Sequence, residues 1–384
     1  MPNVLTNLAA DIYKAADMVG RELVGFIPSV TINGDATNRV AKGDTIRSHF
    51  TRTPAVNTTF APSMTIPEGT DQTVDNKTFS VNNYASVQIP YTGIDVKHLD
   101  NGSGFQTVYG DQIKQAMRAI VNSIEAGVGV AAKNGASRAF GTAGTTPFAS
   151  DFNAVAEVRQ ILVDNGMPLS DGQVTLVINS LAGTKLRNLA QLQKANEAGN
   201  TDLLRQGTLL DLQGLMFKES AGVALHTKGT GSGYLVNNVS NIAVGATTVA
   251  ADTGTGTILA GDVVTFAADG VNKYVVGSAL SGGAFALNDP GARVVLPDNN
   301  AITVGNNYAG NVAFHRSAIE LACRAPELPN GGDAAVDMLT VQDPISGLVF
   351  DIAVYKGYQK VMIEIRCLWD VKVWKPNHVA LLLG

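Results

Sequence analysis

The sequence has few of the residues from which most active sites and metal sites are built. It contains only two cysteines, Cys323 and Cys367, and five histidines scattered over positions 49, 98, 226, 315 and 378. Two cysteines this far apart form neither a disulfide framework nor a zinc-binding spacing. We therefore expect two buried thiols and no metal site formed by residues close together in the sequence. A metal site could then only be assembled from distant residues by the fold.

Charge is also scarce, because Asp, Glu, Lys and Arg together make up 16% of the residues, with a net charge of -5. Domains that hold nucleic acid through its phosphates usually show a basic face or tract, and no cluster of Lys and Arg is present. No segment is apolar over the roughly 18 residues that a membrane span needs, and the N-terminus does not resemble a signal peptide. We expect a soluble protein, made in the cytosol, with no membrane partner.

The common catalytic motifs are absent as well. The patterns GxxxxGK[ST], HExxH and GxSxG do not occur, and no GxGxxG opens a helix. Aspartates gather in turns of residues 229–311, where solvated turns are favoured over a calcium site: Asp252, Asp262, Asp269, Asp289 and Asp298. We expect no catalytic residue and no cofactor, with an enzyme site assembled around His226, His315 or Asp262 as an alternative.

One stretch, NVAFHRSAIELACRAPELP at 311–329, does concentrate reactive residue types. Its apolar residues recur at spacings of three and four, and Pro326 closes the run, so the pattern predicts a helix. On a helix, His315 and Ser317 point to different faces. This geometry argues against a serine nucleophile hydrogen-bonded to a histidine base.

The sequence does contain two strong helical patterns. Residues 3–25 predict an amphipathic helix whose apolar face needs a partner. Residues 105–133 predict a second helix, about 40 Å long at 1.5 Å per residue, with polar residues such as Glu125 off the apolar stripe. We expect the stripe to hold this helix to the body of the protein, through Tyr109, Ile113, Met117 and Ile120.

Extended patterns dominate between these helices. From residue 29 to about 99, polar and β-branched residues alternate between Gly and Pro breaks, and TFSVNNYASVQIPY reads as a half-buried strand. The segment has few large apolar residues before Phe79, so it predicts a hairpin that lies on something else. We expect Phe79, Val87 and Ile89 to pack on a neighbouring subunit or on the long helix. An ordinary surface β-meander is the alternative.

The second half of the chain contains two kinds of predicted secondary structure. Residues 150–193 read as helix, strand and helix, which indicates an α+β body. Residues 229–311 lack Cys, Met, Trp, His and Glu, and short β-prone runs recur about every ten residues, which predicts an inserted all-β domain. The alternating run KVMIEIRCLWDVKVW predicts a long strand, and we expect Trp369 and Trp374 to anchor the last strands.

This order of parts resembles the major capsid (coat) proteins of tailed bacteriophages, which share the Hong Kong 97 phage fold. The resemblance covers the whole chain, and its more specific parts are LLRQGTLLDLQGLMFKESAGV and NVAFHRSAIELACRAPELP. The coat proteins of some short-tailed phages are similar in carrying an inserted β-barrel between two such segments.

The resemblance implies a fold class and a division of the chain. The fold would be α+β, with an N-terminal arm, an extended hairpin called the E-loop, a long spine helix, peripheral and axial domains, and the inserted all-β domain. The implied boundaries are 1–28 for the arm, 29–98 for the E-loop, 99–140 for the spine helix and peripheral domain, 141–228 and 312–345 for the axial domain, 229–311 for the inserted domain, and 346–384 for closing peripheral strands.

The resemblance also implies a major capsid protein that self-assembles into an icosahedral shell around double-stranded DNA, through a scaffold-directed procapsid that expands on packaging. Its partners would be further copies in hexamers and pentamers, a scaffolding protein, a portal, non-specifically bound DNA and decoration proteins. It would lie in the virion capsid after assembly in the host cytoplasm, and we expect neither a fused scaffold nor a cleaved prosegment. An extracellular adhesin or carbohydrate-binding protein is the alternative that the Gly/Thr-rich residues favour.

Overall fold

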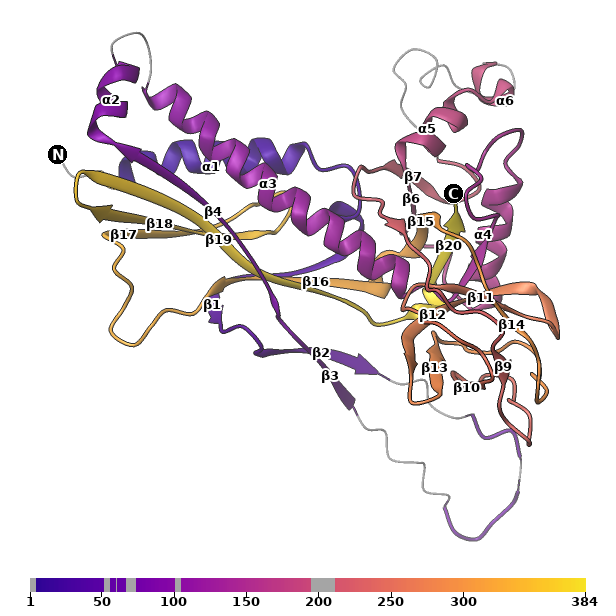
Figure 1. Cartoon of the computed structure of the whole chain (residues 1–384). Helices are drawn as coiled ribbons and strands as arrows, with labels where there is room; N and C mark the ends of the chain where they lie inside the picture. Colours follow the sequence, from indigo (N-terminus) through magenta and orange to yellow (C-terminus); the bar gives the residue numbers. More distant parts are fainter. Residues whose placement is uncertain (1–4, 52–55, 60, 67–73, 101–104, 195–210) are drawn as a thin grey trace.

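The computed structural model describes the chain except for residues 1–4, 52–55, 60, 67–73, 101–104 and 195–210. Two lobes lie side by side, and a hairpin projects below them (Figure 1). One lobe is elongated and contains a long helix and a six-stranded sheet, whereas the other is built on a twelve-stranded sheet. Among the described helices, none is long and apolar enough to cross a membrane.

The sheet of the elongated lobe has the order β1-β16-β19-β18-β17, and β4 also pairs with β19. Its strands are β1 (Thr31–Val40), β4 (Asn83–Thr92), β16 (Ile319–Pro326), β17 (Asp337–Gln342), β18 (Val349–Gly357) and β19 (Lys360–Val373). The long strand β19 is central, so Ile363, Ile365 and Cys367 of its apolar row are buried. Arg366 of the opposite row is also buried, because its guanidinium pairs with the Asp351 carboxylate on β18.

Helices α1 and α3 cover one face of this sheet, with α2 leading into α3 (Figure 1). Their bounds are α1 (Leu5–Arg21), α2 (Gly93–Asp100) and α3 (Phe105–Asn134). The apolar stripe of α3 faces the core, where Ile113, Met117 and Ile120 are buried. Gly127 permits a close approach to the sheet, because a Cβ there would lie 2.1 Å from the ring of Trp369.

The second lobe is built on a sheet of order β7-β6-β15-β20-β5-β12-β13-β10-β9, with β8, β11 and β14 also paired to it. Its strands are β5 (Arg138–Phe140), β6 (Val174–Ile178), β7 (Met216–Glu219), β8 (Leu225–His226), β9 (Leu235–Val236), β10 (Thr248–Asp252), β11 (Val263–Phe266), β12 (Asp269–Ser281), β13 (Ala284–Leu287), β14 (Ile302–Val304), β15 (Tyr308–His315) and β20 (Val379–Leu383). The helices of this lobe are α4 (Asn153–Asp164), α5 (Ser180–Arg187) and α6 (Ala190–Gln193), and three 3-10 turns complete the chain at Ile27–Ser29, Arg316–Ala318 and Pro376–His378.

The predicted inserted domain has its own apolar core, formed by strands β9 to β14. Its sheet is nevertheless continuous with that of the second lobe, because β12 pairs with β5 through Tyr274 and Arg138. We call strands β9 to β14 and their turns the β-insert. The run ARVVLP at 292–297, which reads as a strand in sequence, contributes only a bridge between Ile242 and Leu296.

A separate two-stranded sheet forms the projecting hairpin, from β2 (Thr45–Thr51) and β3 (Val74–Ser80). The main-chain groups of Gly43 and Asp44 bond to those of Val81, which closes the root of the hairpin. The strand predicted across residues 78–91 is therefore two strands, β3 and β4, which are interrupted at Val81 and Asn82.

The helix predicted within residues 311–329 is wrong, because this stretch forms β15, a 3-10 turn and β16. β15 lies between β6 and β20, and β16 lies between β1 and β19, so both strands are buried. A short apolar run in a central strand shows no clear alternation, and spacing alone does not distinguish it from a buried helix. The predicted axial segment 312–345 is also divided, with β15 in one sheet and β16 and β17 in the other.

Candidate assembly surfaces

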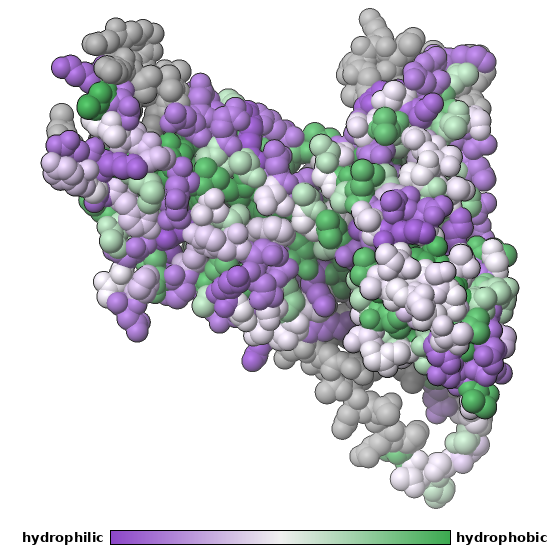
Figure 2. All heavy atoms as spheres, viewed as in Figure 1, coloured by the Kyte–Doolittle hydropathy of each residue, from purple (hydrophilic) through white to green (hydrophobic). Residues whose placement is uncertain are grey.

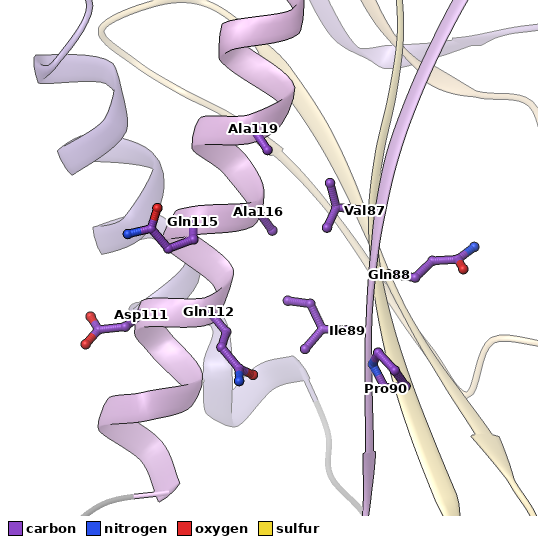
Figure 3. Close-up of a pocket in the computed structure, with 9 residues that line it drawn as sticks. All are labelled: Val87, Gln88, Ile89, Pro90, Asp111, Gln112, Gln115, Ala116 and Ala119. Carbon is purple, nitrogen blue, oxygen red and sulfur yellow. The ribbon is translucent and has the colours of Figure 1, made fainter.

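An open groove lies between α3 and β4 in the elongated lobe (Figure 3). Val87 and Ile89 of β4 point toward α3, whereas Gln88 points to the other side of the strand. On α3, Ala116 and Ala119 leave space because their side chains end at Cβ. The groove has a volume of about 640 Å³ and a more apolar than polar lining, so it fits a bulky apolar side chain. We call it the α3–β4 groove.

The far part of the hairpin exposes large apolar residues. Val56, Met64 and Ile66 are 83%, 105% and 89% exposed. Their segment extends away from both lobes, and green hydrophobic atoms lie along it in the surface view (Figure 2). Exposed apolar side chains that gather on a projecting segment are typical of a surface that is covered by a partner. We call residues 56–59 and 61–66 the hairpin loop.

The root of the hairpin is fixed to its own chain. Phe79 on β3 lies edge-on to the indole of Trp374, with ring centroids 5.6 Å apart, and Lys77 Nζ lies 5.8 Å from that ring. The Trp374 Nε1–H donates to a Glu320 carboxylate oxygen at 2.6 Å, and Asn33 Nδ2–H donates to the other at 2.7 Å. The hairpin is therefore oriented at its root, while its loop stays uncovered within one chain.

The sequence-predicted contact residues are thus placed in three settings. Val87 and Ile89 border the α3–β4 groove, and Phe79 lies against Trp374 of the same chain. The buried ones, in the core between α3 and β19, are Ile113, Met117, Ile120 and Trp369. The side chain of Tyr109 lies outside the described part of the structure. Whether any of them contacts a second copy stays a prediction.

The pair that a helix would have separated, His315 and Ser317, is in fact hydrogen-bonded. His315 Nδ1 lies 2.8 Å from Ser317 Oγ, and His315 Nε2 lies 2.7 Å from Asp171 Oδ2. The bond from His315 lowers the pKa of the Asp171 carboxyl group. The sequence-based exclusion of this pair was therefore wrong, because it assumed the wrong secondary structure.

The geometry nevertheless indicates a turn cap. His315 Nδ1 also accepts the main-chain N–H of Ser317 at 3.2 Å, and the ring thereby caps the 3-10 turn. A general base must take a proton on the nitrogen that faces the nucleophile. Here a proton on Nδ1 would oppose the N–H that the same nitrogen accepts, so the cluster orders the crossover from β15 to β16.

Both cysteines are buried free thiols, as the sequence predicted. Cys323 Sγ contacts the main chain of Val349, which places it in the core between β16 and β18. Within the described residues, no group of three His, Cys, Asp or Glu side chains is placed to hold a metal ion.

Sequence reasoning missed a buried carboxylate that joins the N-terminal segment to α3. Glu125 accepts the main-chain N–H groups of Phe26 at 2.6 Å and Ile27 at 2.9 Å, and the hydroxyl of Ser220 at 2.6 Å. In the sequence, a side chain off the apolar stripe of α3 is expected to face solvent. The three donors come from other segments, so only the folded structure places them next to Glu125. Its signal in sequence is weak, because the partners are 95 to 99 residues away.

It also missed a row of buried ionisable groups where α3 meets the β-insert. Lys133, His226 and Asp262 are 5%, 7% and 0% exposed, and each lies within hydrogen-bond distance of the next. Sequence analysis proposed His226 and Asp262 only as members of an alternative enzyme site. The structure brings them together as a contact between two parts of the fold.

No family model matches the chain, and no curated protein matches it. Several solved structures are similar to it. The capsid structure of cyanophage P-SCSP1u matches with a TM-score of 0.51 at 11% identity, over 94% of this chain and 88% of that chain. A Mycobacterium phage Che8 structure matches with a TM-score of 0.48 at 13% identity, over 94% of this chain and 91% of that chain. The chain therefore has the Hong Kong 97 type of phage capsid fold, an α+β fold that here carries a β-insert.

Proposed function

We propose that this chain is the major capsid protein of a tailed phage, which self-assembles into the icosahedral shell around double-stranded DNA. The observation that carries the proposal is the fold that it shares with the cyanophage capsid structure over nearly its whole length. Fold alone does not fix function, so the surfaces have to agree with it. They do, because the hairpin loop and the α3–β4 groove both expose apolar side chains that stay uncovered within one chain.

Self-assembly uses these two surfaces. A copy in the shell inserts apolar side chains of its hairpin loop, such as Met64 and Ile66, into the groove beside Val87 and Ile89 of a second copy. Burying one such side chain stabilises a contact by about 1.5–3 kcal/mol, and the contact repeats at every subunit of a closed ring. Hexamers and pentamers of this kind build the shell.

The same proposal covers the partners and the location. The shell forms in the host cytoplasm around a scaffolding protein as a procapsid, incorporates a portal, expands as DNA enters, and accepts decoration proteins outside. A net charge of -5 suits a lining that holds DNA only weakly. The role is structural rather than catalytic, in agreement with the capping geometry of His315 and Ser317.

The test combines the loop variant Met64→Asp/Ile66→Asp with the matched control Val271→Asp, whose wild-type valine is 89% exposed on the β-insert. Sedimentation velocity of each protein, co-expressed with its scaffolding protein, separates shells from free subunits. We expect wild-type and control proteins to form shells, and the loop variant to stay unassembled with an unchanged melting temperature. Shells of normal yield from the loop variant would overturn this assignment of the contact.

A further inference from the structure

Three buried ionisable side chains form a single row where α3 meets the β-insert. Lys133 in the last turn of α3 places its Nζ 2.7 Å from His226 Nδ1 on β8. His226 Nε2 in turn lies 2.7 Å from Asp262 Oδ1, in the turn that precedes β11. The C-terminal end of α3 points into the part of the second lobe that carries β11 and β12 (Figure 1). We call this row the seam.

The seam belongs to a wider set of bonds that fasten the β-insert to α3. Asp262 accepts the main-chain N–H groups of Gly229 at 3.0 Å and Leu259 at 2.7 Å, so it ties the segment before β9 to the turn before β11. The Asn288 side-chain amide donates to the carbonyls of Asn134 and Ala136, both at 2.7 Å, just beyond Lys133. Opening the seam would therefore loosen the turns of the β-insert next to α3.

One protonation state with an ammonium group on Lys133 satisfies every bond of the seam. Asp262 accepts main-chain N–H groups and is the acceptor for His226, so His226 Nε2 carries the proton. His226 Nδ1 is then free to accept a hydrogen bond from the Lys133 ammonium group. In this state the seam holds one cation, one neutral ring and one anion, and every bond has a donor and an acceptor.

A second proton on His226 is incompatible with this geometry. It would put an N–H on Nδ1 and a positive charge on the ring, 2.7 Å from the Lys133 ammonium nitrogen. Both groups are almost fully buried, so water and salt screen the repulsion poorly. Among the described residues, Tyr308 of β15 also faces the seam. Burial, together with the nearby Asp262 charge, raises its pKa, so it stays neutral and supplies no negative charge.

The environment already disfavours positive charge at this point. Burial lowers the pKa of Lys133 to about 8, and only the attraction of Asp262 opposes that change. The site thus tolerates one cation, and a second cation on His226 would have to share the single carboxylate of Asp262 with Lys133.

We propose that the seam is an acid-sensitive lock: Lys133, His226 and Asp262 hold the β-insert to α3 near neutral pH, and protonation of His226 releases it. This is a property of the single chain and is independent of the proposed capsid function. It assigns a role to His226 that needs neither a metal nor a substrate.

Hydrogen exchange read by mass spectrometry tests the lock, on peptides that contain Gly229 and Leu259, whose amides bind Asp262. The full chain is compared at about pH 7.5 and about pH 5.5, a range that spans histidine titration, with rates corrected for intrinsic pH dependence. We expect the corrected exchange rates of these peptides to rise about tenfold or more at the lower pH. Opening that is coupled to the uptake of one proton becomes about tenfold more favourable for each pH unit below the pKa of the free group. Peptides from β19, in the elongated lobe, should not change.

Two variants identify the groups. Lys133→Gln replaces the cation with an amide whose oxygen accepts a hydrogen bond from protonated His226, so the acid response should disappear. His226→Gln, which does not titrate, should also show no acid response. His315→Gln is the matched control, because His315 likewise contacts a carboxylate, that of Asp171, but lies outside the seam. Unchanged wild-type exchange at the lower pH, or an acid response that persists in Lys133→Gln, would overturn the proposal.

Discussion

The ring of Phe79 on β3 meets the indole of Trp374 edge-on, with an interplanar angle of 80°. This contact joins the hairpin to the crossover that follows β19, and Trp374 is itself held by the Glu320 carboxylate. Edge-to-face aromatic pairs favour one relative orientation of the two rings. The pair therefore sets the direction in which the hairpin leaves the body.

Phe79→Ala removes that contact. We expect a loss of about 3 kcal/mol in the free energy of unfolding, the usual cost of a buried Phe-to-Ala truncation. The fluorescence emission of Trp374 should shift to longer wavelength as its indole becomes more exposed to water. The only other tryptophan of the sequence is Trp369, whose emission has to be distinguished from that of Trp374. Tyr358→Ala is the control, because Tyr358 is 92% exposed and should change neither quantity. An unshifted spectrum in Phe79→Ala would contradict the account of the hairpin root.

Glu125→Gln tests the join between the N-terminal segment and α3. An amide keeps one acceptor oxygen, so at least one of the three donors from Phe26, Ile27 and Ser220 loses its partner inside the protein. We expect the unfolding free energy to fall by about 1–3 kcal/mol, measured by urea denaturation. Glu327→Gln, at an exposed position, should leave the midpoint unchanged. Equal midpoints for the two variants would refute the role assigned to Glu125.

Ile365→Ala tests the central strand of the elongated lobe. Ile365 is fully buried in β19, so truncation should lower the unfolding free energy by about 2–5 kcal/mol. Val271→Ala on the β-insert is the control, since Val271 is 89% exposed and the change should cost almost nothing. Differential scanning calorimetry measures the melting temperature of both variants. An Ile365→Ala protein with the melting temperature of the wild type would show that β19 is not a core strand.

His378 predicts acid sensitivity of the second lobe. Burial first, then the charges of Lys375 and His315, lower its pKa to about 4 in the folded chain from 6.5. Between these two pH values the unfolded chain binds a proton at His378 that the folded chain does not. The free energy of unfolding is therefore unaffected by His378 above pH 6.5 and decreases as the pH falls toward 4. His378→Gln should remove about 1–3 kcal/mol of that acid loss, measured by urea denaturation at successive pH values. A pH dependence identical to that of the wild type would contradict the prediction.

The long helix shows what the sequence can determine. Its apolar stripe predicts 105–133 and the structure has 105–134, because a pattern sustained over so many turns admits one secondary structure. β15 and β16 show the opposite case. Their residues are buried by partners from distant parts of the chain, and a buried run carries no alternation that spacing rules could read.

The seam shows why functional clusters were harder to predict than elements. Lys133 and His226 are 93 residues apart, and His226 and Asp262 are 36 apart. Each looks ordinary within its own segment, and the pairings of β5 with β12 and of β8 with β15, together with the approach of α3, bring them into contact. The groove beside Val87 and Ile89 was partly accessible from sequence, because the alternation of β4 identified the face that the strand presents.

Electron microscopy of negatively stained particles tests the central claim most directly, with the protein produced alone and together with its scaffolding protein. The account predicts closed shells of uniform diameter, or regular rings of subunits, when the scaffolding protein is present. A protein that stays a dispersed monomer in every condition, while folded by its melting curve, would contradict the assignment as a capsid protein.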